Sequence, residues 1–308
     1  MFGFIKKKDV KKGYFSPPSI AEHLPWEDFN DDLNLMALED GRSVGCGFEI
    51  LGLPMDSRSD ELVEKTAKAF ESMIADLLPR EDGDPWVCQW FFSFDENLDP
   101  LKDRLNDFIE CEDELAAEYK KIINEHLDII SSGMFVDPIS DNLFRGRLPR
   151  IKLLIYRRYN NDKIKPDSVS EILDVRDKVE SKLKQCGLAF FQLSGRHFYA
   201  WLYRWFNLKS PSFDVSNYKE EKPYGWCLSQ NAFNCDIEIK NNHWHFGGVP
   251  HGVMVVKELN TQLKPGILNR EMAHGAGDQR YAIIDKLPEN VVYTIQCIFQ
   301  KYAVSKPN

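Results

Sequence analysis

Residues 42–54 restrict the fold of this chain most, because their pattern predicts an apolar strand that is interrupted by glycines. The strand runs from Val44 to Leu53 and follows a turn at Glu39-Asp40-Gly41. A short apolar segment bounded by turn residues is typical of a strand inside a sheet. The rest of the chain must therefore supply strands that pair with it and helices that cover it.

Three later segments have apolar residues every three or four positions, which predicts amphipathic helices. The first holds apolar residues from Leu62 to Leu78 on one face and begins after capping residues at 56–59. An acidic helix is expected over residues 101–130. The third starts at Ser168 and runs to about Gln185, with Gly187 as the residue that ends it.

Further strands are expected where aromatic and β-branched residues cluster between turn residues. They are Trp86–Phe94, Arg150–Tyr159, Phe233–Ile239, Val249–Lys257 and Val291–Phe299. Residues 198–206 fit either a buried helix or a strand, because periodicity does not separate the two over so short a segment.

This order of helices and strands predicts an α+β fold with mainly antiparallel sheets and helices packed on one face. Two ferredoxin-like units, each with a split β-α-β order, would accommodate it. Along the chain we expect a flexible basic leader at residues 1–20, a first α+β unit at 21–140 and a second at 141–308.

Composition excludes several classes of protein. Hydrophobic residues make up 43% and aromatic residues 12% of the chain, which indicates an ordered globular protein. No apolar run approaches the roughly 18 residues that a membrane-spanning helix needs, and the N-terminus has no secretory signal. The seven cysteines form no Cys-x-x-Cys pair, so we expect reduced thiols in a cytosolic compartment.

Charge is distributed unevenly along the chain. The net charge of −9 argues against nucleic acid as a general partner. Ten carboxylates fall in residues 95–118, and eight basic side chains fall in residues 145–165. Two blocks of opposite sign predict either pairing within the fold or complementary surfaces for assembly. In the leader, the five lysines and the apolar residues among them fit either an anionic lipid surface or a solvated terminus.

The basic block supplies the candidate partner-binding residues. They are Arg145, Arg147, Arg150, Lys152, Arg157 and Arg158. Guanidinium groups bind carboxylates and phosphates through two parallel hydrogen bonds. Three interpretations stay open: an edge strand charged against aggregation, a contact with an acidic partner, and a site for phosphate or single-stranded DNA.

Histidines form the most metal-like cluster, although its spacing matches no standard zinc signature. The weak candidate ligands are His243, His245 and His251. The alternative is a pair of strand-face histidines beside Trp244. A nucleophilic triple such as Cys46, His197 and Asp214 is expected by chance among so many cysteines and histidines, and we assign no catalytic or cofactor-binding residue.

Four segments carry a resemblance to a known family. They are Leu24–Pro54 with its glycine-punctuated strand, Leu143–Tyr159 with an Arg-Gly-Arg turn and paired arginines, His197–Pro211 with Trp-Phe-Asn before a proline, and Tyr281–Phe299 with an Asp-Lys-Leu-Pro turn. Together they resemble the N-terminal region of the TraC-like conjugative transfer ATPases of bacterial type IV secretion systems.

The resemblance implies a protein that takes part in DNA transfer and pilus assembly. Family members have a RecA-like motor in their C-terminal part and an N-terminal region that docks on the inner-membrane machinery. This chain has no G-x-x-x-x-G-K-[ST] phosphate-binding loop, so no catalytic residue carries over, and ATP and Mg are expected only for a motor domain outside these residues.

We therefore expect a docking domain that is non-catalytic alone, cytoplasmic, and peripheral at the inner membrane. Its implied partners are inner-membrane components of the secretion channel and other copies of the full-length protein, with no small-molecule substrate and no nucleic acid. The alternative is a stand-alone nucleic-acid-binding or adaptor protein of a mobile element that uses the basic patch at residues 145–165.

Overall fold

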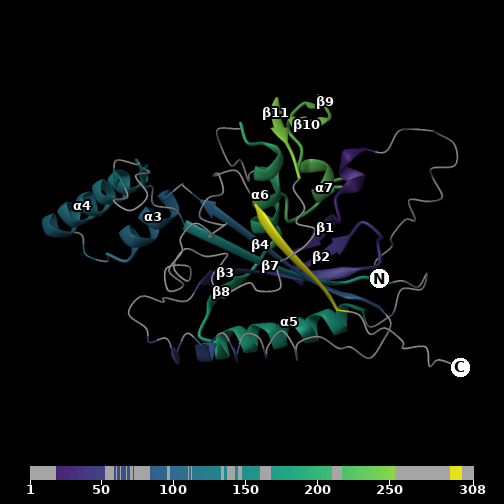
Figure 1. The fold of residues 1–308 in the computed structure, drawn as a ribbon, viewed down its shortest axis with the longest axis horizontal. Coiled ribbons are helices and arrows are strands. Elements are labelled where there is room, and N and C mark those ends of the chain that lie inside the picture. The colour runs from purple at the N-terminus through teal and green to yellow at the C-terminus, as the bar shows by residue number, and fades with distance from the viewer. Residues whose placement is uncertain are drawn as a thin grey trace, which may run out of the picture. The chain divides into compact units, whose positions relative to one another are not determined.

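The computed structural model describes most of the predicted helices and strands (Figure 1). The described residues are 19–52, 59, 61–62, 64–66, 68–69, 72, 84–95, 98–109, 111, 113–132, 135–136, 143–144, 148–159, 168–209, 217–253 and 292–299. The expected leader lies outside them except for its last two residues, and the first predicted helix is described only at scattered helical positions between 61 and 72.

The described elements alternate as an α+β fold requires. The helices are η1 (Ile20–His23, a 3-10 helix), α3 (Asp99–Asp107), α4 (Glu114–Ser131), α5 (Ser168–Gln185), α6 (Gly195–Phe206) and α7 (Leu228–Asn231). The strands are β1 (Trp26–Asn30), β2 (Leu35–Leu38), β3 (Val44–Gly52), β4 (Trp86–Asp95), β5 (Phe135–Val136), β6 (Leu143–Phe144), β7 (Leu148–Arg157), β8 (Ala189–Gln192), β9 (Ile237–Lys240), β10 (His243–Phe246), β11 (Val249–His251) and β12 (Tyr293–Phe299).

The largest sheet confirms the predicted α+β class. Its strand order is β1-β2-β3-β7-β4-β12, with β8 paired to β3. Within it, the order β8-β3-β7-β4 is that of a ferredoxin-like unit, because β7 separates β3 from β4 and α5 connects β7 to β8. Among the described residues one such unit occurs. The same residues also form a three-stranded sheet (β9–β11) and the two-stranded pair β5–β6.

Strand β3 is the center of this sheet and forms where the sequence predicts it. Its first residues pair with β2 and its later residues pair with β8, both antiparallel. Gly45 allows β7 to approach closely, since a Cβ there would lie 2.6 Å from the Cβ of Tyr156 and 2.7 Å from the carbonyl oxygen of Ile155. The glycine is therefore needed for the β3–β7 packing.

Helix α5 has the bounds that the sequence predicts. Its buried side chains include Ile172, Val179 and Leu183, and it contacts β3 and β8. Gly187 has a positive φ of 71°, and the amide of Leu188 donates to the carbonyl of Leu183 at 3.1 Å. This is the glycine-terminated end expected for the helix.

The ambiguous aromatic segment is a helix, α6. Ser194 precedes it in an extended conformation, and its side chain accepts a hydrogen bond from the amide of His197. Phe198, Tyr199 and Leu202 are buried along one face. The N-cap serine and the spacing of buried residues by three and four therefore decide between the two predicted alternatives.

Three sequence expectations need correction. The acidic helix expected over residues 101–130 is two helices, because Asp113 caps a new helix by accepting from the amide of Ala116 at 2.7 Å. The strand expected at Phe233–Ile239 begins only at Ile237. The strand expected from Val249 ends at His251 in the described part, and residues 254–257 lie outside it.

Strands β1, β2, β5, β6 and β8 were not predicted. Strands β1 and β2 form an antiparallel hairpin within the acidic segment that precedes β3, with a turn at residues 31–34. The side chain of Asn30 accepts from the amide of Leu33 at 2.9 Å, and Asn34 has a positive φ of 53°. This turn chemistry, typical of Asn, allows the chain to reverse.

The chain divides into two compact units, neither of which is continuous in sequence. One comprises Met1–Gln89, Leu153–Glu258 and Gln296–Asn308, and the other comprises Trp90–Lys152 and Leu259–Ile295. The sequence-based division into residues 21–140 and 141–308 was drawn along the chain and stays a prediction.

Candidate functional site

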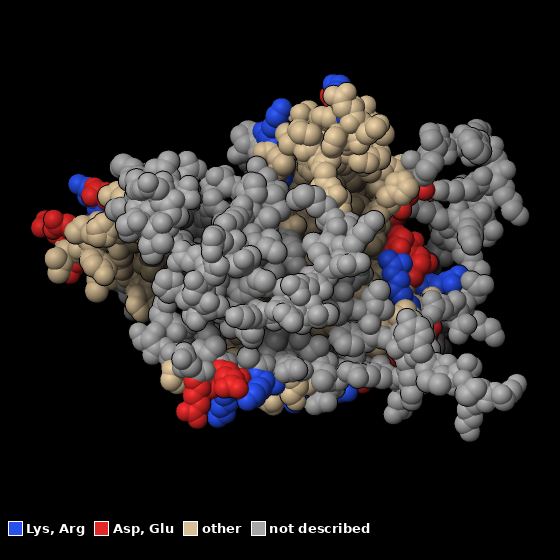
Figure 2. All heavy atoms as spheres, in the orientation of Figure 1, with Lys and Arg blue, Asp and Glu red and all other residues tan. Residues whose placement is uncertain are grey.

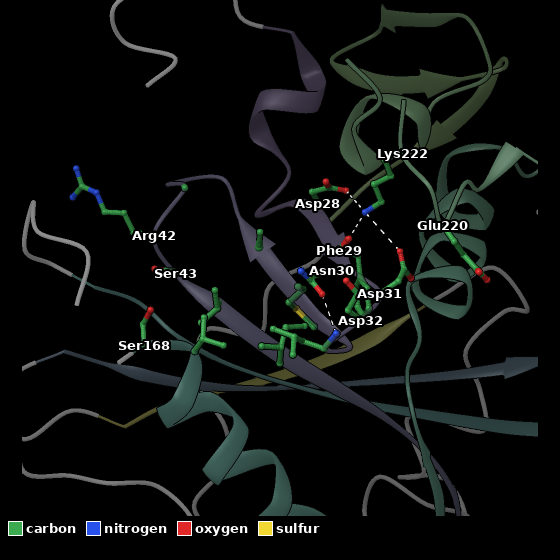
Figure 3. A pocket seen from close by; sticks show the side chains of 17 residues that line it. Asp28, Phe29, Asn30, Asp31, Asp32, Arg42, Ser43, Ser168, Glu220 and Lys222 are labelled. Atoms are coloured by element: carbon green, nitrogen blue, oxygen red, sulfur yellow. Dashed lines mark hydrogen bonds and ion pairs between the residues drawn. The ribbon is translucent and has the colours of Figure 1, made fainter. Parts of the chain in front are cut away.

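A cavity of about 510 Å³ lies beside the β1–β2 hairpin and the start of α5 (Figure 3). Its apolar wall includes Phe29, Leu35 and Met36, which are buried. Its polar lining includes Asp28, Asn30, Asp31, Asp32, Arg42, Ser43, Ser168, Glu220 and Lys222. The β1–β2 hairpin and its turn thus place the carboxylates of Asp28, Asp31 and Asp32 in the cavity lining, together with the ammonium of Lys222 from the segment after residue 217.

Lys222 neutralises part of this acidic lining. Its ammonium lies 2.7 Å from Asp28 and 3.9 Å from Asp31, and it also donates to the carbonyl oxygen of Phe29 (Figure 3). The same ammonium lies 5.4 Å from the ring centroid of Trp226. Since the Lys222 side chain is largely shielded from solvent, these ion pairs and the cation–π contact are stronger than exposed ones.

Tyr218 joins the same cluster through its hydroxyl. The hydroxyl lies 2.5 Å from both carboxylate oxygens of Asp31 and donates its hydrogen to that carboxylate. Burial, followed by this hydrogen bond, raises the pKa of Tyr218 well above its usual range. Gly195, the first residue of α6, leaves the space that the Tyr218 hydroxyl and the Asp31 carboxylate occupy. The tyrosine is therefore held as a neutral donor.

Aromatic side chains hold the hairpin against α6. Trp26 contacts Phe198 edge-on at a centroid distance of 5.4 Å and Trp201 at 5.9 Å, and Phe29 stacks on Phe198 at 5.9 Å. Such pairs add about 0.5–1.5 kcal/mol each beyond their burial. The aromatic block of residues 198–206 is thus largely core, as its composition indicates, and it positions the carboxylates of the hairpin.

Sequence reasoning missed this cluster. Its acids come from a segment in which no strand was predicted, and Tyr218 and Lys222 come from a segment to which no helix or strand was assigned. The signal that could have found it is the run Asp-Phe-Asn-Asp-Asp at residues 28–32, in which turn-forming and acidic residues follow Phe29. The arrangement suits a binding or structural role, because Tyr218, Asp31 and Lys222 are already engaged with one another.

The candidate nucleophile Cys46 is placed where it cannot act on a substrate. Its side chain is fully buried in β3, and burial raises the pKa of its thiol to about 12. His197 lies in α6 with its ring 5.3 Å from Phe191, and Asp214 is outside the described residues. A reactive cysteine needs the opposite, a lowered pKa and an accessible sulfur.

The three candidate metal ligands do not share one face. His251 lies opposite Trp244 in the β10–β11 register, so it lies on the face of Trp244 and not on the face of His243 and His245. One ring nitrogen of His251 is 2.9 Å from the carbonyl oxygen of Trp205. Across the part of the chain that the structure describes, no three His, Cys, Asp or Glu side chains are grouped as a metal site would need.

Two members of the predicted basic set point inward. Arg157 is 0% exposed, pairs with Glu171, and lies over the rings of Trp86 at 5.2 Å and Tyr159 at 5.4 Å. Lys152 is also buried. Because neither side chain is accessible, neither can contribute to a docking surface in this fold.

The remaining members of the set are placed less uniformly. Arg158 is partly exposed and lies 2.6 Å from Glu39, and Arg150 is partly exposed in β7. Arg145 and Arg147 fall outside the described residues. A partner-binding role for these four arginines stays a prediction.

Within the residues described here, the helices include none with both the length and the apolar character needed to cross a bilayer. A family model described as TraC protein matches the chain over residues 20–306. No curated protein matches the chain.

Proposed function

Because this chain belongs to the TraC protein family and so takes part in conjugative transfer, we propose that it is an assembly and docking module of a bacterial type IV secretion apparatus. In this proposal the module binds inner-membrane components of the channel from the cytoplasmic side, as a peripheral protein. It does not hydrolyse ATP by itself, and the ATP and Mg that power transfer belong to a motor outside these 308 residues.

The observation that carries the proposal is the family match over residues 20–306 in a sequence without a phosphate-binding loop. A transfer ATPase needs backbone amides and a lysine to hold the phosphates, and these come from the G-x-x-x-x-G-K-[ST] loop. Gly247-Gly248 and Gly275-Ala276-Gly277 are not followed by Lys-Ser or Lys-Thr. Both features support a role in assembly and not in energy conversion.

The geometry of the candidate site agrees with this role. Asp28, Asp31 and Lys222, which line the cavity, are engaged with one another, and the buried thiol of Cys46 has a raised pKa. The nucleic-acid alternative gains no support, because Arg157 and Lys152 are buried and leave fewer cations for phosphate.

Nucleotide binding tests the first half of the proposal. The purified chain is titrated with a fluorescent ATP analogue and Mg, and phosphate release is followed in parallel. We expect neither binding at micromolar concentrations nor hydrolysis. Micromolar affinity for the analogue would refute the claim that this chain is non-catalytic.

The effect of the chain on conjugative transfer tests the second half of the proposal, which is the docking role. The chain is produced in increasing amounts in donor cells that carry its own conjugative system. A module that docks without a motor occupies the docking position, so transfer frequency should fall as its level rises. Cells with an unrelated transfer system serve as the control, and an unchanged frequency in the cognate system would overturn the docking role.

A further inference from the structure

Helix α4 presents an exposed row of apolar side chains, here named the α4 stripe: Leu115, Tyr119, Ile122 and Ile129. Their exposed fractions are 75%, 57%, 43% and 37%. Spacings of four, three and seven residues place all four on one helix face. An apolar row of this kind on the surface marks a site of interaction more often than an isolated apolar residue does.

The stripe is separate from the face that α4 already buries. Ala116 and Leu127 are buried on the adjoining side. Lys102 in α3 lies 2.5 Å from Asp128, and the side chain of Asn106 donates to that of Asn124 at 3.2 Å. Because these contacts fix α4 against α3, the apolar residues of the stripe are not needed for that packing.

A row of glutamates borders the stripe. Glu114, Glu118 and Glu125 lie next to it at helical spacing, and they are all exposed. Lys121 lies beyond this row and is 3.8 Å from Glu125. Figure 2 shows acidic atoms, with some basic ones, beside uncharged atoms at the position of α4. The surface is therefore apolar along its middle except at exposed His126, which lies between Ile122 and Ile129, and negative along one side.

The negative border of the stripe decides between three possible partners: a second copy of this chain, an anionic lipid surface and a basic helix. A second copy docking through the same face would bring glutamates against glutamates, which is unfavourable. An anionic lipid surface would be repelled by the same row. A helix with apolar residues on one face and lysines or arginines beside them matches both the stripe and its acidic border.

We propose that the α4 stripe binds a basic amphipathic helix of a partner protein. The apolar face of that helix covers Leu115, Tyr119, Ile122 and Ile129, and its cations pair with Glu118 and Glu125. The inference deepens the proposed function, on which it rests for the identity of the partner as a component of the transfer apparatus. The chemistry of the surface does not depend on that identity.

The test uses designed peptides as probes of the purified full chain. One fluorescent helical peptide carries leucines on one face and lysines on the other, and its matched peptide has glutamates in place of the lysines. We expect the lysine peptide to bind at least about tenfold more tightly and to lose affinity as salt rises. Glu118→Lys with Glu125→Lys should reverse this preference.

Variants of the stripe locate the binding. Ile122→Ser should abolish binding of the lysine peptide, and Tyr119→Ser repeats the test at a second position. Ile239→Ser is the matched control, because Ile239 is a similarly exposed apolar side chain in β9 and its loss should leave binding unchanged. Circular dichroism of each variant establishes that its helices are intact.

Four outcomes would overturn the proposal. The first two are equal affinity of the chain for the two peptides and loss of peptide binding in Ile239→Ser. The third is binding of the chain to phosphatidylglycerol vesicles, if Ile122→Ser abolishes that binding. The fourth is self-association of the chain, if Ile122→Ser abolishes it. Each is read without nucleotide or transfer. If the peptides do not bind as expected but the chain still lowers transfer frequency in donor cells, only the proposal for the α4 stripe is refuted. If the peptides bind as expected but transfer frequency is unchanged, the docking role is refuted.

Discussion

The hydroxyl of Tyr218 donates to the carboxylate of Asp31, with both carboxylate oxygens at 2.5 Å, across 187 positions of sequence. The contact ties the β1–β2 hairpin to the segment that also supplies Lys222. Because Tyr218 is buried and its acceptor is a carboxylate, this hydrogen bond belongs to the stronger class. The hairpin therefore depends on a distant part of the chain for its position.

Removing that hydroxyl should destabilise the protein. In Tyr218→Phe the carboxylate of Asp31 loses a charged hydrogen bond, so we expect the free energy of unfolding to fall by about 1.5–3 kcal/mol. Chemical denaturation measures the change. Tyr224→Phe is the matched control, since Tyr224 is fully exposed, and an equal loss in both variants would contradict this account.

Adding a methyl group at Gly195 should disturb the same contact. The new Cβ would overlap the Tyr218 hydroxyl and the Asp31 carboxylate, so we expect Gly195→Ala to lower the free energy of unfolding by about 1–3 kcal/mol. The loss should be smaller in a Tyr218→Phe background, because part of the overlap is gone. Gly252→Ala is the control, as open space surrounds Gly252, and strict additivity would argue against the shared contact.

Arg157 should act as a structural residue. Its buried guanidinium pairs with Glu171, and removing one partner of such a pair costs about 3 kcal/mol or more. We expect Arg157→Met to lower the midpoint of urea unfolding strongly, whereas Arg158→Met, at a partly exposed pair with Glu39, should change stability by less than about 1 kcal/mol. Similar small effects for both would return Arg157 to the candidate docking residues.

Alkaline conditions should weaken the fold through Cys46. Burial raises the pKa of its thiol from 9.0 to about 12, against a smaller opposing effect of Arg176. The unfolded chain therefore releases this proton first as pH rises, and stability present below pH 9.0 is lost on the way toward pH 12. Urea unfolding at several alkaline pH values should show this decline.

A variant isolates the contribution of the thiol. Cys46→Val removes the ionisable group and should flatten the alkaline decline in part, because the raised pKa values of Tyr159 and Tyr218, both caused first by burial, contribute in the same direction. Alkylation offers an independent check: exposed Cys111 should react in the folded protein, and Cys46 should not. An unchanged pH profile in Cys46→Val would exclude the thiol as a cause.

Elements with a complete local signature were predictable. Helix α5 combines an apolar repeat with a glycine stop, and β3, β4, β7 and β12 are apolar or aromatic segments between turn residues, so periodicity and turn chemistry suffice. The α+β class followed from the order of these elements. The family was recognisable from four segments, and the match over residues 20–306 confirms it.

The sequence by itself thus determined the main strands, the helix α5, the fold class and the family of this protein. Only the tertiary structure decided that residues 198–206 form a helix, that Arg157 faces Glu171 in the interior, and that the β1–β2 hairpin meets Tyr218 and Lys222. The physical reason is range: periodicity and caps act over a few residues, whereas burial and ion pairing depend on which distant segments the sheet order brings together.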